Sequence, residues 1–166
     1  AFDSHEAIAI TAVNGDIIKI NEAFTEITGY TEDEVIGVNA RILKSNVHSP
    51  KFFKNMWKQI TTVGKWNGEI YNKRKNGDTY PELLSITAIK DEEENITSYI
   101  AQFLDITELK EAQAKVQHQA DYDFLTGLMN RKHFNERLEE EFVRAKRHDY
   151  FEAFLFIDLD KFKNIN

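Results

Sequence analysis

Two carboxylates near the end of the chain have a spacing that favours chemistry. In the stretch FIDLDKFKNIN, residues 156–166, Asp158 and Asp160 are separated by a single residue within an apolar, strand-like segment. Alternate residues of a β-strand point to the same face of the sheet. We therefore expect the two carboxylates to gather on one side of a strand.

A calcium-binding EF-hand loop is the first alternative for this stretch, because acids or amides stand at positions 158, 160, 164 and 166. The loop requires a glycine where this chain has Lys163, and an oxygen ligand where it has Phe162. No glutamate follows at the twelfth position. The pattern does not favour calcium.

Composition excludes several kinds of site. The chain of 166 residues has no cysteine, so a disulfide framework, a thiolate zinc site and a cysteine nucleophile are all excluded. The formal net charge of −7 opposes attraction to phosphate backbones, and we expect no nucleic-acid partner. There is no signal-peptide pattern and no run of about 20 apolar residues that could span a bilayer. We expect a cytoplasmic protein without membrane contact in these residues, although a longer parent chain could be anchored upstream.

The first hundred residues combine strands and short helices. Asn14-Gly15 and Asn76-Gly77 are strong hairpin signals, and the acidic stretch 91–95 predicts a third turn. Between the hairpins, a capping box at Thr31 and Ser49-Pro50 at a helix start predict short helices. Pro81 lies inside a predicted strand, so we expect its position to be an edge or a bulge.

The remaining residues predict mainly helix. Residues 107–121 have apolar residues at alternating spacings of three and four, as in a short coiled-coil seam; an isolated solvated linker helix is the alternative. A second helix is expected from Arg131, and a buried strand over 153–159. These seven residues are too apolar for a disordered tail, which disfavours a single domain with a loose end. We interpret residues 122–166 as the first piece of an α/β domain.

The order of elements in residues 5–107 resembles a PAS sensor domain. Three stretches carry the resemblance: NEAFTEITGYTEDEVIG, WNGEIYNKRKNG and the closing LDIT. The resemblance implies an α+β fold, with a five-stranded antiparallel sheet, flanking short helices and a ligand pocket on the concave face. It also implies that Asp105, Ile106 and Thr107 relay the signal from sheet to linker. We accordingly divide the chain into a PAS domain at 1–106, a helical signalling linker at 107–121 and a cyclase fragment at 122–166.

The segment NARILKS, residues 39–45, is similar to the flavin-binding segment of light-sensing PAS domains, but Ala40 replaces their reactive cysteine. It also resembles redox-sensing PAS domains that hold FAD without a cysteine. The resemblance implies FAD or another small ligand in the pocket. The implied cofactor-binding residues are Asn39, Arg41, Trp66, Glu69 and Asn72, with Arg74 beside them. Asparagines could bind the edge of a flavin ring and an arginine its phosphate. Three of these residues also have a simpler interpretation: Asn39 as a turn former, Arg41 as a surface ion-pair partner and Trp66 as a core residue.

Haem is the other cofactor to weigh, and it requires an axial histidine. The helix expected at 50–62 contains none, and His48 lies just outside it. An isolated loop histidine is more often a solvated polar residue than a ligand. We therefore favour an organic ligand, or a pocket that serves only as a core, over haem.

The stretch DFLTGLMNRKHF, residues 123–134, resembles the opening of the GGDEF family of diguanylate cyclases. FIDLDKFKNIN follows at the distance found in that family. The resemblance implies that Asp158 and the backbone carbonyl of Leu159 bind Mg²⁺. It further implies that Lys163 contacts the GTP phosphates and Asn166 the guanine. The family's signature of two glycines, an acidic pair and phenylalanine is absent from these residues, so Mg²⁺ and GTP are expected only in a complete domain and this chain by itself is expected to be inactive.

Together the two resemblances imply a sensor that regulates the synthesis of cyclic di-GMP from two GTP. The implied partners are a second copy of the chain, bound through the PAS domain and the linker helix, and the chain's own cyclase domain. The alternative is a PAS domain attached to a degenerate GGDEF domain, which acts as a nucleotide receptor or a dimerisation scaffold.

Overall fold

The computed structural model describes residues 6–123, 125–148, 150, 151, 153 and 155. The chain divides into two compact units, Ala1–Ala112 and Gln113–Asn166. The first contains a β-sheet with short helices, and the described part of the second is helical.

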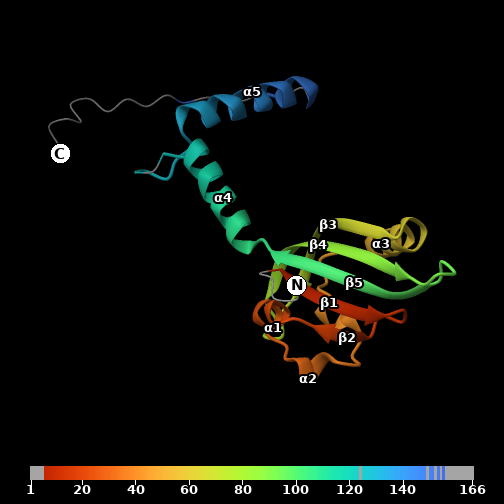
Figure 1. Cartoon of the computed structure of the whole chain (residues 1–166). Coiled ribbons are helices and arrows are strands. Elements are labelled where there is room, and N and C mark those ends of the chain that lie inside the picture. Colours follow the sequence, from red (N-terminus) through yellow and green to blue (C-terminus); the bar gives the residue numbers. More distant parts are fainter. Residues whose placement is uncertain (1–5, 124, 149, 152, 154, 156–166) are drawn as a thin grey trace. The chain divides into compact units, whose positions relative to one another are not determined.

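The first unit is built on a five-stranded antiparallel sheet with the strand order β2-β1-β5-β4-β3 (Figure 1). The strands are β1 (Ala7–Ala12), β2 (Ile17–Ile20), β3 (Lys65–Lys73), β4 (Thr79–Lys90) and β5 (Ile96–Asp105). Both Asn-Gly turns form where the sequence predicts them, since Gly15 and Gly77 adopt the left-handed φ angles of +87° and +98° that glycine tolerates. The predicted fold class is confirmed.

Three helices and one 3₁₀ turn connect β2 to β3. They are α1 (Glu22–Thr28), α2 (Glu32–Val35), η1 (Ala40–Leu43) and α3 (Pro50–Val63). The predicted capping box is present, because the backbone N–H of Thr31 donates to Oε2 of Glu34 at 3.0 Å. Ser49 caps α3 as expected, and its Oγ accepts from the backbone N–H of Phe52 at 3.3 Å. Local sequence signals thus set where these helices begin.

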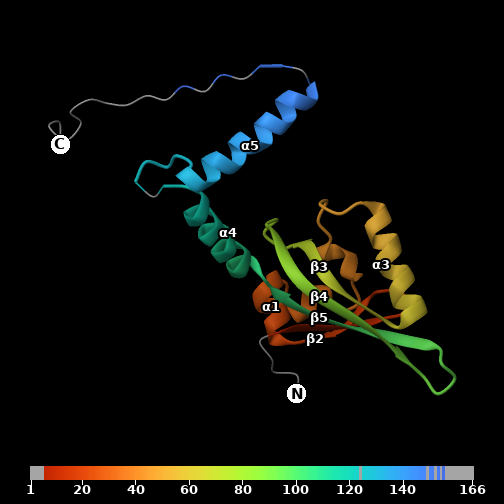
Figure 2. The same ribbon diagram turned by 90° about the horizontal axis from the view of Figure 1, so that it is seen from above.

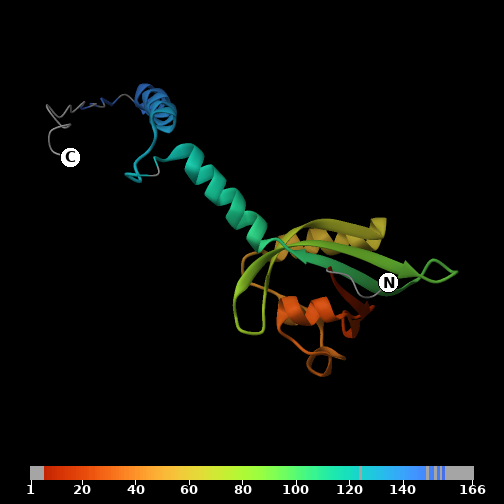
Figure 3. The same cartoon turned by 60° about the vertical axis from the view of Figure 1, so that its left-hand side comes forward.

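The core lies between one face of the sheet and the helices, and the turned views in Figures 2 and 3 show α1 and α3 packed against the sheet. Strand β4 shows the alternation clearly: Tyr80, Leu84 and Ile86 are buried, while Leu83 between them is 50% exposed. Phe24 from α1 and Ile60 from α3 cover the same buried face. All the helices that cover this face come from the connection between β2 and β3.

Helix α4 (Thr107–Asp121) follows β5 directly, and α5 (Arg131–His148) follows α4. The helix α5 begins at Arg131 as the sequence predicts, and Asn130 caps it, since its Oδ1 accepts from the backbone N–H of His133 at 2.9 Å. No helix in the described part of the chain is both long and apolar enough to cross a bilayer. The predicted strand over 153–159 lies largely outside the described residues.

Candidate functional site

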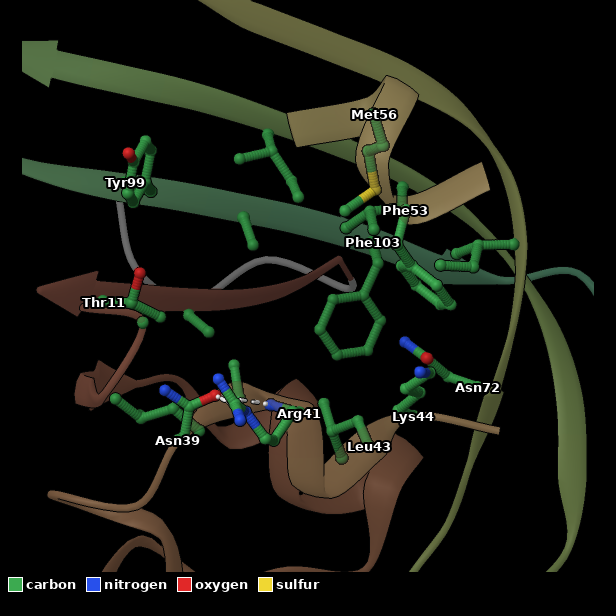
Figure 4. A pocket seen from close by; sticks show the side chains of 18 of the residues that line it. Thr11, Asn39, Arg41, Leu43, Lys44, Phe53, Met56, Asn72, Tyr99 and Phe103 are labelled. Atoms are coloured by element: carbon green, nitrogen blue, oxygen red, sulfur yellow. Dashed lines mark hydrogen bonds between the residues drawn. The ribbon is translucent and has the colours of Figure 1, made fainter. Parts of the chain in front are cut away.

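A pocket of about 440 Å³ opens between the inner face of the sheet and the helices (Figure 4). Its walls are mainly apolar: Phe24 comes from α1, Phe53 and Met56 from α3, and Leu84 and Phe103 from the sheet. An apolar cavity of this size with a few convergent polar groups is the usual form of a small-molecule site.

Polar and cationic side chains from η1 and its flanks line one part of the pocket. Asn39 caps η1, and its Oδ1 accepts from the backbone N–H of Arg41 at 3.3 Å and from its Nε at 2.8 Å (Figure 4). The Asn39 amide also donates to the carbonyl of Asn14 at 2.9 Å. Asn39 thus joins the first hairpin to η1 and orients Arg41. Lys44 follows the last residue of η1, and its ammonium lies 4.7 Å from the ring centroid of Phe53.

A second polar group is formed by Asn72 on β3 and Glu82 on β4, which both line the pocket. Asn72 Nδ2 donates to Oε1 of Glu82 at 2.8 Å. Glu82 is 0% exposed, and its Oε2 makes no hydrogen bond to any residue that the structure describes. This leaves a buried carboxylate oxygen in a cavity that can hold a ligand.

The surroundings of Glu82 favour its neutral form. Burial raises the pKa of Glu82 to about 7, and the nearby charge of Asp105 raises it too, whereas Tyr80, Asn72 and Arg74 lower it. The Tyr80 hydroxyl influences this pKa but, within the described residues, makes no hydrogen bond of standard geometry. Burial also raises the pKa of Tyr80, so the phenol stays neutral. Glu82 is therefore poised to change charge near neutral pH.

The junction between sheet and helix is held by Asp105. Its Oδ1 accepts from the backbone N–H and the hydroxyl of Thr107, at 2.8 and 2.6 Å, and its Oδ2 pairs with the guanidinium of Arg74. The Arg74 guanidinium also donates to the carbonyl of Ile27 in α1, and it lies 4.0 Å from the ring centroid of Tyr80. These contacts fix the point at which α4 begins.

Ile106, between these two junction residues, is 6% exposed, and its backbone N–H donates to the carbonyl of Pro81 at 3.1 Å. Asp105, Ile106 and Thr107 therefore lie together as one structured junction. Their part in signal relay stays a prediction.

The five predicted cofactor-binding residues are only partly brought together. Asn39, Arg41 and Asn72 line the pocket, whereas Trp66 and Glu69 are not among its lining residues. The indole of Trp66 packs edge-on against Phe52, with ring centroids 6.0 Å apart. Glu69 Oε2 accepts from the ammonium of Lys110 in α4 at 2.7 Å. The roles of all five in cofactor binding stay predictions.

His48, the only residue weighed as a haem ligand, is engaged elsewhere. Its Nε2 accepts from the backbone N–H of Tyr71 at 2.9 Å, and its ring stacks on Phe52 with centroids 4.1 Å apart. Burial lowers the pKa of His48, consistent with the neutral ring that this hydrogen bond requires. His48 does not line the pocket.

The predicted magnesium and nucleotide residues, Asp158, Leu159, Lys163 and Asn166, lie outside the described residues. The same holds for the stretch weighed as a calcium loop. Within the described ranges, no group of three or more histidine, cysteine, aspartate or glutamate side chains could hold a metal ion.

Glu82 is the site residue that sequence reasoning missed. The signal was present in the stretch TYPELLSITA, where the inward positions of an alternating strand read Tyr80, Glu82, Leu84 and Ile86. A glutamate in such a series is predicted to point into the core, where a carboxylate is rarely found without a partner.

Two family models match the chain. A PAS domain model matches residues 5–108, and a model of the diguanylate cyclase GGDEF domain matches residues 120–166. Both resemblances, to a PAS domain and to the start of a GGDEF domain, are confirmed.

Among curated proteins, the bacterioopsin transcriptional activator of Halobacterium salinarum is 31% identical over 119 residues, which are 69% of this chain. A blue-light-activated histidine kinase of Brucella anthropi is 32% identical over 91 residues, or 55% of this chain. The chain spans about a fifth of the length of these relatives, 18% in each case.

Solved structures have the same fold. The PAS domain of a protein from Colwellia psychrerythraea is 26% identical with a TM-score of 0.62, over 65% of this chain and 92% of that one. A light-oxygen-voltage domain studied with a flavin analogue is 25% identical with a TM-score of 0.58, over 69% of this chain and 87% of that one.

Proposed function

Because this chain belongs to the PAS domain family through residues 5–108, we propose that its sheet unit senses a small ligand and regulates the diguanylate cyclase whose GGDEF model matches residues 120–166. The proposed output is the joining of two GTP molecules into cyclic di-GMP.

One observation carries the proposal: one of the strands that line the pocket, β5, is also the strand that leads into α4. Tyr99, Ala101 and Phe103 of β5 line the pocket, and β5 ends at Asp105, which is bonded to the first residue of α4. A change in the pocket that displaces β5 therefore acts on the start of the connecting helix. A ligand shifts such an equilibrium only if it binds the two arrangements with different affinity.

The proposed regulation is geometric and requires two copies of the chain. Each cyclase domain holds one GTP, so two domains must face each other before the reaction can occur. We propose that α4 forms part of the dimer, because Leu109 and Val116 are 55% and 66% exposed and share the spacing of a coiled-coil seam. Rotation or a change of register in a two-helix seam would permit or prevent the meeting.

We further propose a flavin as the ligand, on the chemistry of the lining residues. The mainly apolar walls suit an aromatic ring system, and Asn72 and Glu82 offer hydrogen-bonding groups to its polar edge. We propose that Arg41, which also lines the pocket, binds a phosphate of the ligand. A bound flavin would supply reversible redox chemistry, and the absence of cysteine from the sequence excludes a thiol adduct. The relative studied with a flavin analogue supports this choice.

The test is the visible absorption spectrum of the protein purified from cells, followed by mass spectrometry of anything released on denaturation. A flavin spectrum and a released flavin mass are the expected results. A different released compound would replace flavin as the ligand and keep the sensor role. A colourless protein that releases nothing, and whose stability no flavin changes, would contradict the proposal of a flavin sensor.

The cyclase output is tested separately, by incubating the full-length parent with GTP and Mg²⁺ and measuring cyclic di-GMP. Synthesis is the expected result. A parent that binds GTP without converting it would support the alternative of a nucleotide receptor.

A further inference from the structure

The pocket and the junction are connected through one pair of acidic residues. Glu82 and Asp105 are direct partners in the register of β4 and β5, and directly opposite residues have side chains on the same face. Glu82 lines the pocket, and Asp105 holds the start of α4. Like charges placed directly opposite each other on neighbouring strands destabilise the pairing.

The guanidinium of Arg74 acts on both carboxylates. Arg74 is ion-paired to Asp105, and the electrostatic influence of the same guanidinium reaches Glu82. The other groups that affect Glu82 are Tyr80 on its own strand and the neutral amide of Asn72 on β3. With Glu82 neutral, Arg74 serves Asp105 alone; with Glu82 ionised, two opposed carboxylates compete for it.

From this arrangement we propose that the occupant of the pocket sets the charge of Glu82. Ionisation of Glu82 then loosens the hydrogen bonds by which Asp105 holds the first residue of α4. The inference rests on the proposed sensor function and adds the regulation of that same site. An occupant that donates an N–H or O–H to the free Oε2 of Glu82 favours the ionised form, and an apolar occupant favours the neutral form. The ligand class that switches the junction is therefore a hydrogen-bond donor.

The backbone of Thr107 provides a direct readout. Its N–H donates to Oδ1 of Asp105, whereas the neighbouring N–H of Ile106 donates to the carbonyl of Pro81. The proposal concerns only the first of these bonds. The Ile106 amide is thus an internal control, one residue away.

The experiment changes the charge of Glu82 by changing the pH, without an added ligand. Amide exchange is measured on the whole chain across a pH series around 7, the value to which burial raises the pKa of Glu82, and is expressed as protection relative to an unfolded peptide. The Glu82 carboxyl is followed in parallel by carbon NMR. The variants are Glu82→Gln, which mimics the neutral acid, and the control Glu92→Gln in the exposed turn after β4.

The expected result is a several-fold loss of protection at Thr107 that follows the titration of Glu82, with little change at Ile106. It should be absent in Glu82→Gln and present in Glu92→Gln. An unchanged Thr107 amide across the titration overturns the coupling, and so does a Glu82 midpoint near the ordinary 4.5. The carbon NMR titration of Glu82 needs no variant, so a midpoint near 4.5 would overturn the coupling even if Glu82→Gln fails to fold.

The outcome is separable from that of the proposed function. A ligand released by the purified protein, together with an unresponsive Thr107 amide, overturns the coupling and leaves the sensor role standing. A responsive amide in a protein that binds no ligand supports the coupling and counts against the proposed ligand.

Discussion

Glu82 and Asp105 lie directly opposite each other on β4 and β5, so that a carboxylate buried in the pocket faces the carboxylate that holds the start of α4. This relationship places a titratable carboxyl of the pocket next to the junction between β5 and α4. The burial of Glu82, with a smaller contribution from Asp105, also gives the protein a specific dependence of stability on pH.

The first prediction concerns that pH dependence. Because the pKa of Glu82 is raised to about 7 in the folded chain from an ordinary 4.5, the folded state retains a proton that the unfolded state has lost. The associated stability is fully present below about pH 4.5 and is lost as the pH rises through about 7. The shift corresponds to roughly 3 kcal/mol at alkaline pH.

Glu82→Gln removes this cost, so at alkaline pH it should unfold at a higher denaturant concentration than the wild type, and near pH 4.5 the two should be similar. Denaturant titrations over the pH range measure the difference. A constant difference at all pH values would show that Glu82 does not titrate in this range.

The second prediction concerns the junction. Asp105→Ala removes the acceptor for Thr107 and the partner of Arg74, which should cost about 2 kcal/mol of unfolding free energy. Burial by itself raises the pKa of Asp105, but the hydrogen bonds from Arg74 and Thr107 outweigh it and hold the pKa below the usual value. The stability that Asp105 provides is therefore present at neutral pH and is lost as the pH falls through its lowered pKa.

Chemical denaturation at neutral and acidic pH checks this, with Asp33→Ala at an exposed position of α2 as the control. The difference between wild type and Asp105→Ala should shrink in acid. A difference that grows in acid would contradict the assignment.

The third prediction concerns the pocket. Ala101 lines the cavity, and Phe at this position should fill it and expel the ligand while leaving the sheet intact. The neighbouring Ile100 points to the opposite face, so Ile100→Phe places the same phenyl ring outside the pocket and serves as the control. Ligand content per protein after purification is the measurement. Equal ligand content in both variants would place the ligand outside this pocket.

The fourth prediction concerns the loop that carries Asn39. A Cβ on Gly15 would lie 3.1 Å from Nδ2 of Asn39, and Gly15 has a φ of +87°. Gly77 has a φ of +98°, with nothing within 4 Å of the same position. Each replacement by alanine should cost about 1 kcal/mol through backbone strain.

Only Gly15→Ala should also weaken ligand binding, since it alone displaces Asn39. Thermal denaturation and ligand affinity, measured on both variants, separate the two effects. An equal loss of affinity in the two would mean that Asn39 has no special role.

The fifth prediction concerns dimerisation. Val116→Glu places a charge among the exposed apolar side chains of α4. It should raise the dimer dissociation constant by at least about tenfold. Gln113→Glu adds the same charge at an already polar position of the helix and serves as the control. Sedimentation equilibrium gives both constants. A dimer unaffected by Val116→Glu would exclude this helix from the interface.

Much of the fold follows from local sequence. The Asn-Gly turns, the Thr31 capping box and the Ser49 cap form as predicted, because each depends on a few neighbouring residues and their backbone hydrogen bonds. Pro81 shows the limit of such reasoning: its strand β4 lies between β3 and β5, so the expected edge position is wrong. The carbonyl of Pro81 accepts from the backbone N–H of Ile106, one residue past the end of β5. The nitrogen of Pro81 therefore lies beyond Glu82 and Asp105, the last paired residues of β4 and β5.

The sequence by itself determined the order of elements, the two families and three polar residues of the pocket, Asn39, Arg41 and Asn72. Only the tertiary structure placed Glu82 beside Asn72 and opposite Asp105, and turned Glu69 toward Lys110 rather than the pocket. The physical reason is that cross-strand partners are set by sheet register between residues far apart in the chain. Local propensity specifies which residues form a strand, but the neighbours that bury a carboxylate come from the assembled sheet.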